Sequence, residues 1–264
     1  MSDNSNNTTT PVVPVGDFAQ ALRGEIKLSV GTMLQRAWDI TLRSLPWMLG
    51  VFVVLFLINM LLSGVLSSVF PFDEEAFAAQ ESIDWEQLPI GNILASSLLQ
   101  ELIMAPFAAM LVYIGLVNAA DKKPSISGLR KVLQYAPQVV LVALCKLLIT
   151  GITAGLVVVV LSFISGTLAV VLTLLVIIYI QITLMLSVPF VIDRELNAFR
   201  AIMASFLVIN KAMFPVLGLM LLMGIIILIS AIPLFLGLIF TLPMAFNAVG
   251  VVYHSLIGVD TETL

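Results

Sequence analysis

The sequence predicts an all-α fold: a polytopic membrane helical bundle with six transmembrane helices. Of the 264 residues, 60% are hydrophobic and only 11% are charged, and the mean hydropathy is +1.12. Ordinary soluble domains have about 45–50% apolar and about 25% charged residues, so this chain has too little charge to cover its surface in water. Its apolar residues also gather into six runs, each close to the roughly 20 residues that cross a bilayer.

The six predicted spans cover residues 46–69, 93–117, 139–164, 167–188, 214–232 and 233–256. The connections at 162–166 and 230–233 are so short that spans three and four, and spans five and six, must form antiparallel hairpins. An even number of crossings places both termini on one side. The predicted domains are a disordered cytoplasmic tail at 1–27, a six-span membrane domain at 28–258 and a short cytoplasmic tail at 259–264. The first tail is too polar to bury enough apolar surface to offset its ordering entropy.

The basic residues predict which side the termini face. Eleven of the twelve Lys and Arg residues lie before span one, between spans two and three, or between spans four and five. The connections on the opposite side contain none. Lys and Arg close to span ends are retained in the cytoplasm, so we expect cytoplasmic N- and C-termini. The acidic connection between spans one and two then lies outside, as a solvated loop or, alternatively, as a loop that binds a cation or partner.

An amphipathic segment precedes each pair of spans. In the first segment Arg36, Asp39 and Arg43 recur at a helical spacing, with apolar residues on the opposite face. The interfacial cations of the three segments are Arg36 and Arg43, Arg130 and Lys131, and Arg200 and Lys211. A basic amphipathic helix is stabilised by apolar insertion and by attraction to anionic lipid. The sequence therefore predicts three hairpin-like repeats, each preceded by a cytoplasmic amphipathic helix. The expected partners are anionic lipid headgroups at the cytoplasmic face, with another membrane protein as a further partner class.

Glu101 and Lys146 are the ionisable residues inside the predicted spans, and together they form a candidate polar intramembrane site. Lys146 corresponds in position to Arg43 and Lys211, at the cytoplasmic end of its span, where its stem can reach water. We expect two separate interfacial anchors. A buried ion pair and a proton or substrate relay are the alternatives.

Small and amide residues within the spans predict helix packing. Gly151 and Gly155 form a small-xxx-small motif that permits two helices to approach closely. Single amides in apolar spans favour hydrogen bonds between helices, each worth about 0.6–2 kcal/mol. These amides are Asn59, Gln100, Gln181 and Asn247.

Signatures of catalysis and metal binding are missing from the sequence. It contains no HExxH, GxSxG, Walker or GxGxxG motif. The sole histidine, His254, and the sole cysteine, Cys145, offer no ligand cluster for a metal. We therefore expect no enzyme, no catalytic residue, no cofactor and no metal site. With a net charge of -4, nucleic acid is not an expected partner.

Four short motifs lie in the last third of the chain: PFVIDRE at 189–195, AIMAS at 201–205, PLFLG at 233–237 and TLP at 241–243. With the span layout, they resemble the YciC-like family of bacterial inner-membrane proteins, over roughly residues 28–258. The resemblance implies a multi-pass protein of the inner membrane and no catalytic residue. We therefore expect a non-enzymatic envelope factor that acts through lipid or protein contacts. The alternative is a small transporter or the membrane subunit of one.

Overall fold

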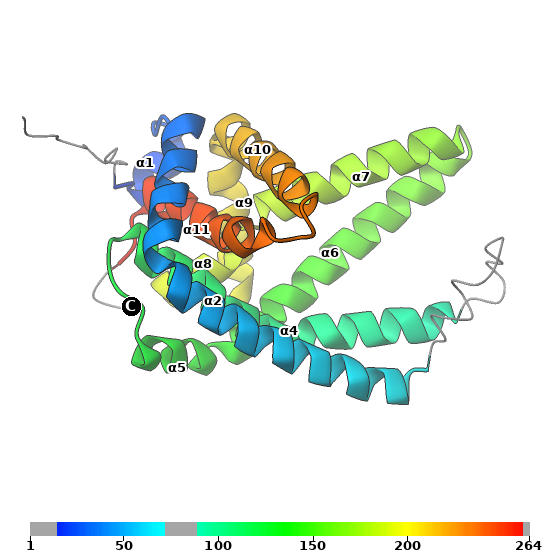
Figure 1. Cartoon of the computed structure of the whole chain (residues 1–264). Coiled ribbons are helices and arrows are strands. Elements are labelled where there is room, and N and C mark those ends of the chain that lie inside the picture. Colours follow the sequence, from blue (N-terminus) through cyan, green and yellow to red (C-terminus); the bar gives the residue numbers. More distant parts are fainter. Residues whose placement is uncertain (1–14, 72–88, 261–264) are drawn as a thin grey trace, which may run out of the picture.

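The computed structural model of the chain describes residues 15–71 and 89–260, and all regular structure in these two ranges is helical (Figure 1). Six segments are long and apolar enough to cross a membrane, if α7 and α8 are taken together. The all-α prediction and the number of spans are thereby confirmed. The helices are α1 (Phe18–Arg23), α2 (Val30–Val69), α4 (Ile90–Ala119), α5 (Ile126–Gln134), α6 (Ala136–Ser162), α7 (Gly166–Thr183), α8 (Ser187–Arg194), α9 (Ala198–Lys211), α10 (Met213–Ala231) and α11 (Leu238–Ile257).

The fourth span differs from its predicted form, because it is broken into two helices. α7 ends at Thr183, and α8 begins at Ser187 after one turn of irregular backbone. Pro189 has no N–H to donate to the carbonyl of Met185, so a continuous helix could not keep its hydrogen bonds here. The break redirects the last part of this span.

The first amphipathic segment is not a separate helix. α2 runs without interruption for 40 residues, which is about 60 Å, or twice the hydrocarbon thickness of a bilayer. The Ser29 hydroxyl caps its start by accepting a hydrogen bond from the N–H of Thr32. Figure 1 shows α2 changing direction along its length, as expected of a helix that contains Pro46. Residues 30–45 therefore belong to the same helix as the first span.

α11 lies at the centre of the bundle, packed against both α2 and α4. A Cβ added to Gly250 would overlap the carbonyl of Gly115, and one added to Gly115 would overlap the carbonyl of Phe246. The backbones of α4 and α11 thus touch where both helices carry glycine. Gly151 and Gly155 mediate no close helix approach within this chain, because open space surrounds both positions.

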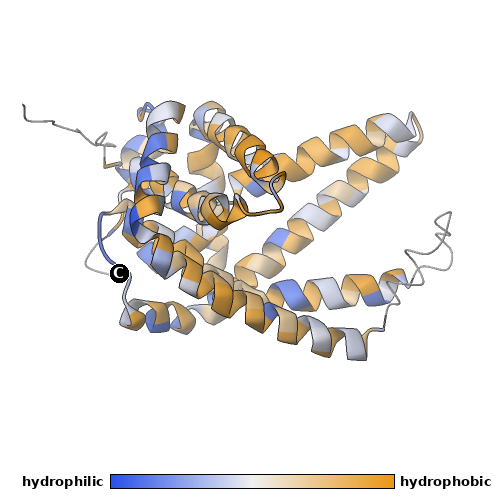
Figure 2. Cartoon of the chain, viewed as in Figure 1, coloured by the Kyte–Doolittle hydropathy of each residue, from blue (hydrophilic) through white to orange (hydrophobic). Residues whose placement is uncertain are grey.

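The α6–α7 hairpin projects from this core as an arm (Figure 1). No residue in the most apolar stretch of α6 is buried, and Phe163 at the tip is 86% exposed. Figure 2 shows hydrophobic residues along both helices of the arm. In water such a surface would be strongly unfavourable, whereas lipid solvates it. The exposed apolar surface of the arm is therefore expected of a multi-pass membrane protein.

The chain before α2 packs against the core, so the predicted disordered tail does not hold for residues 15–27. The N–H of Gly16 donates to the carbonyl of His254, at 3.0 Å, and Ala21 of α1 is buried. Asp17 caps the start of α1 and Gly24 its end. Residues 1–14, the acidic connection within 72–88 and residues 261–264 lie outside the described residues.

Candidate functional site

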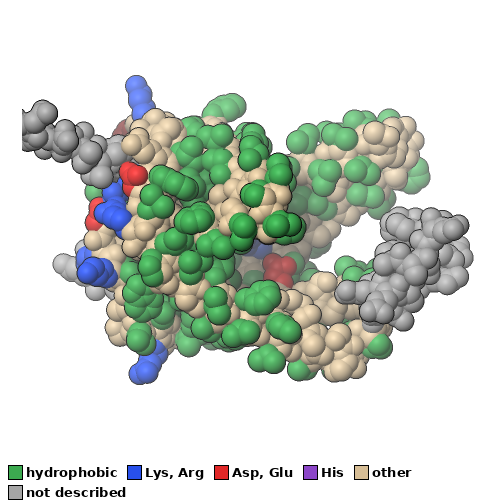
Figure 3. Space-filling model, in the orientation of Figure 1, with side chains coloured by type: hydrophobic (Ala, Val, Ile, Leu, Met, Phe, Trp, Pro, Cys, Tyr) green, Lys and Arg blue, Asp and Glu red, His purple; other side chains and the backbone are tan. Residues whose placement is uncertain are grey.

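Contacts between distant segments bring the basic residues together at one end of the bundle, which we call the basic end. Arg43 Nη2 lies 3.3 Å from Asp121 Oδ1, joining α2 to the connection after α4. Lys131 Nζ lies 3.8 Å from Glu195 Oε1, joining α5 to the connection after α8. Figure 3 shows most of the Lys and Arg on this face gathered at the left of the molecule. By their place in the chain, we assign to the basic end the cations of the first part of α2, of the segment from the end of α4 to α5, and of the segment from α8 to α9: Arg36, Arg43, Lys122, Lys123, Arg130, Lys131, Arg194, Arg200 and Lys211.

Asp121 organises the part of the basic end next to α2. It adopts the left-handed conformation, with φ of 57°, which Asp tolerates better than most residues. The N–H of Lys122 donates to the carbonyl of Val117 at 2.9 Å, which closes a Schellman turn at the end of α4. The turn presents the Asp121 carboxylate to Arg36 and Arg43, two helical turns apart on α2. Arg36 is only 8% exposed, so it serves this ion pair and not the interfacial role that the sequence predicted.

Glu195 plays a similar part after α8. It is also left-handed, with φ of 52°, and its carboxylate accepts a hydrogen bond from the hydroxyl of Tyr135, at 2.6 Å. Desolvation and this hydrogen bond raise the pKa of Tyr135 to about 12, so the phenol stays a donor at neutral pH. The contact joins the start of α6 to the start of α9.

A cavity of about 350 Å³ opens at the basic end, between α2 and the connection after α4. We call it the basic cavity. Three cationic side chains line it, against the single carboxylate of Asp121. The other polar groups are a hydroxyl, a buried amide and an indole N–H. Its lining includes Arg43, Ser44, Trp47, Asn118, Lys122 and Lys123.

A second hollow, of about 610 Å³, lies directly beside the first, between α2, α4 and α5. We call it the apolar groove. The indole of Trp47 lines both hollows, and it is the one polar side chain among the described residues that line the groove. The wall includes Gly50, Val54, Ile58, Phe107, Met110 and Leu129.

A buried network of amides and hydroxyls ties α2, α4 and α11 together beneath the basic cavity. The Asn247 amide donates to the Thr41 hydroxyl at 2.8 Å, and its oxygen accepts from the Asn118 amide at 3.0 Å. The prediction that Asn247 bonds across helices is therefore confirmed. Asn59, Gln100 and Gln181 make no side-chain hydrogen bond with another described residue.

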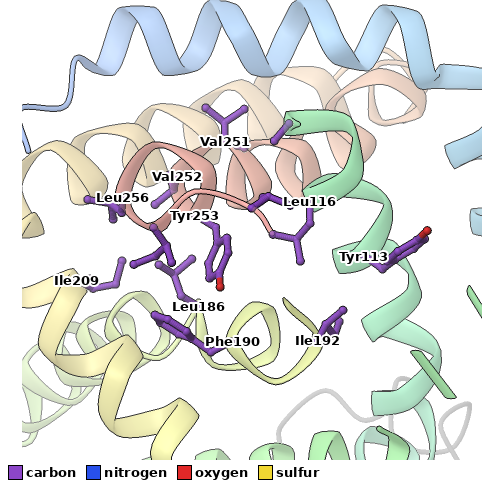
Figure 4. Close-up of a cluster of buried hydrophobic side chains, with 14 of the residues drawn as sticks. Tyr113, Leu116, Leu186, Phe190, Ile192, Ile209, Val251, Val252, Tyr253 and Leu256 are labelled. Carbon is purple, nitrogen blue, oxygen red and sulfur yellow. The ribbon is translucent and has the colours of Figure 1, made fainter. Parts of the chain in front are cut away.

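Asp193 is fully buried, and sequence reasoning did not find it. Its Oδ2 accepts from the hydroxyl of Tyr253 at 2.7 Å, and its Oδ1 accepts from the N–H of Asp260 at 2.8 Å. Arg194 lies 3.1 Å away. Figure 4 shows Tyr253 of α11 pointing toward α8, with Phe190 nearby, and their ring centroids are 5.3 Å apart. This cluster fastens the end of α11 to α8.

Glu101 and Lys146 lie on α4 and α6, two helices that pack against each other. Glu101 is exposed and Lys146 is partly buried. The carboxylate is near enough to act electrostatically on the ammonium group. However, none of the ion pairs in the described ranges joins the two residues within 4.0 Å. Their role as separate anchors stays a prediction.

A double-mutant cycle tests that role. We expect Glu101→Gln and Lys146→Gln to have additive effects on thermal stability in detergent, with a coupling below about 1 kcal/mol, as for exposed ion pairs. The measurement is the unfolding temperature of the two single variants, the double variant and the wild type. Strong coupling would show a buried pair and would favour the transporter alternative.

Arg130, Arg200 and Lys211 are exposed, and their role as interfacial cations stays a prediction. Lys122 and Lys123 belong to the eleven basic residues that predict the orientation. Their place beside Arg43 in the cavity depends on the packing of α2 against the connection after α4. Within the two described ranges no group of three or more His, Cys, Asp or Glu could hold a metal. Comparisons with protein-family models, with curated proteins and with solved structures find no match for this chain.

Proposed function

We propose that this protein is a multi-pass protein of the bacterial inner membrane with both termini in the cytoplasm. It acts as a non-enzymatic envelope factor, through contacts of its basic end with anionic lipid headgroups or with another membrane protein. The observation that carries this proposal is the separation of charge along the bundle. Cations gather at one end, while hydrophobic residues predominate along the arm formed by α6 and α7.

The helices at the basic end support a role at the membrane surface. α5 and α9 each combine an exposed cation with exposed apolar side chains, as Arg130 does with Ile126 and Arg200 does with Phe199. Such helices insert apolar groups among the headgroups while their cations attract anionic lipid. Each cation near the surface contributes about 1 kcal/mol to that attraction.

We further propose that the chain consists of three related hairpin units, each with an amphipathic segment, and that it is a member of the YciC-like family. Three helix ends support the repeat. α4, α8 and α11 are each followed by a residue with positive φ: 57° at Asp121, 52° at Glu195 and 74° at Gly258. The family proposal draws on the PFVIDRE motif, whose Phe190, Asp193 and Glu195 all make the contacts described above.

Reporter fusions test the proposed orientation. A phosphatase that is active only in the periplasm should give signal when fused after Glu81, and none when fused after Lys123 or Leu264. The reason is that cations near span ends are retained in the cytoplasm. A reporter active only in the cytoplasm provides the control, with the reverse pattern. Phosphatase activity of the Lys123 fusion would exclude this orientation.

A further inference from the structure

We propose that the basic cavity and the apolar groove together form a single binding site for one anionic phospholipid. The phosphate of the headgroup occupies the basic cavity, and one acyl chain lies in the apolar groove. This inference rests on the proposed function, because the basic end has to lie at the membrane surface for a lipid to reach the site.

The two hollows follow each other along α2, in the order in which a lipid changes from polar to apolar. The basic cavity uses the stretch from Ile40 to Trp47, and the groove uses the stretch from Pro46 to Ile58. The groove therefore extends about 18 Å along the helix, which is comparable to half of a hydrocarbon core about 30 Å thick. An amphiphile that lies along α2 meets cations first and apolar side chains next.

Charge selects the headgroup. Arg43, Lys122 and Lys123 line the basic cavity, while its carboxylate, Asp121, is also paired with Arg36 behind it. Among the residues that line the cavity, three cations thus stand against one carboxylate. The contact between Arg43 and Asp121 at 3.3 Å holds the guanidinium at the cavity wall before any ligand arrives. The cations of the cavity attract the phosphate of an anionic headgroup. A zwitterionic headgroup also carries a positive charge, which the same cations repel.

The groove selects an acyl chain by its lining and its space. Aliphatic and aromatic side chains from α2, α4 and α5 form its wall, and its volume of about 610 Å³ is in the range of ligand pockets. Gly50 keeps part of the groove open, because no atom lies within 4 Å of a Cβ built there. A large side chain at position 50 would fill the groove without disturbing the packing of α2.

Native mass spectrometry of the intact protein in detergent tests the site. Titrated with phosphatidylglycerol, the wild-type chain should retain one lipid at concentrations at which it retains no phosphatidylcholine. Removing two cavity charges in the variant K122Q/K123Q should weaken that binding about 25-fold, at about fivefold per charge. Gly50→Leu should weaken binding of the diacyl lipid, because the leucine fills the apolar groove. It should leave the affinity of the basic cavity for inorganic phosphate unchanged, as measured by competition with the lipid.

Two control variants match these changes outside the site. R23Q/K27Q removes two exposed cations that lie outside the basic end, and Gly151→Leu places the same side chain at a glycine in open space on α6. Neither should alter retention of the single lipid. Thermal unfolding of every variant verifies that it is folded.

The outcomes separate the site from the proposed function. Equal weakening by K122Q/K123Q and R23Q/K27Q would overturn the site and leave general attraction to anionic lipid in place. The lipid site would also be overturned if Gly50→Leu bound the lipid as tightly as the wild type does and if inorganic phosphate bound as tightly as the lipid. The basic cavity would then be a site for a soluble anion. Equal retention of phosphatidylglycerol and phosphatidylcholine by the wild type would overturn both the site and the lipid contacts of the proposed function.

Discussion

Replacing Asp193 with Ala should lower the stability of the intact protein by about 1–3 kcal/mol, the cost of leaving a buried hydrogen-bond donor without its acceptor. Asp193 is fully buried and accepts hydrogen bonds from the Tyr253 hydroxyl and from the N–H of Asp260. Without the carboxylate both donors are left with no acceptor, and Arg194 loses its counter-charge. The end of α11 should then separate from α8.

The control for Asp193 is an ion-paired carboxylate on the surface. Glu25 lies 2.7 Å from Arg23, and both side chains are more than half exposed. Glu25→Ala should therefore change the stability by less than about 1 kcal/mol. Thermal unfolding can be followed with a thiol-reactive dye, because Cys145 is the only cysteine in the chain. Equal losses for the two variants would show that the buried cluster does not fasten α11.

Gly250→Ala should destabilise the bundle by about 3 kcal/mol, the upper part of the range for overpacked cores. The new methyl group would overlap the carbonyl of Gly115, so α4 and α11 would have to move apart. The hydrogen bond from Asn118 to Asn247, at 3.0 Å, lies one turn from this crossing. Separating the helices would therefore also weaken the buried network.

Gly155→Ala is the matched control, since it makes the same chemical change in a helix that leaves the position open. Alanine is a better helix former than glycine by about 1 kcal/mol, so this variant should be neutral or slightly stabilised. Gly250→Ala should thus lower the unfolding temperature, whereas Gly155→Ala should leave it unchanged or raise it slightly. A loss of stability for Gly155→Ala as large as that for Gly250→Ala would contradict the assigned α4–α11 contact.

Hydropathy could predict the spans because each is a local property of about 20 residues. α4 at Ile90–Ala119 and α6 at Ala136–Ser162 lie within a few residues of the predicted ranges 93–117 and 139–164. The partners of each helix could not be predicted in this way. Gly115 and Gly250 become a contact only when α11 lies against α4, whereas the local motif at Gly151 and Gly155 marks no contact. The continuity of α2 through Pro46 was also beyond a local rule, because membrane helices tolerate proline.

The candidate site shows the same division between local and distant information. The sequence predicts the cations of the basic end, but it does not show that Asp121 withdraws Arg36 from the surface, because that depends on the left-handed turn after α4. An acidic residue within the apolar run before Arg194 was visible, but the groups that stabilise Asp193 lie 60 and 67 positions away. The basic cavity and the apolar groove exist only once α2, α4 and α5 have packed together.

The central position of α11 also determines when the core of the protein can be completed during synthesis. α2 and α4 leave the ribosome long before α11, whose Asn247 is separated from Thr41 by 206 positions. Until α11 is synthesised, Thr41 and Asn118 lack their amide partner, and the glycine surface of α4 has no helix against it. A nascent chain therefore carries an incomplete core in its first two spans through most of translation.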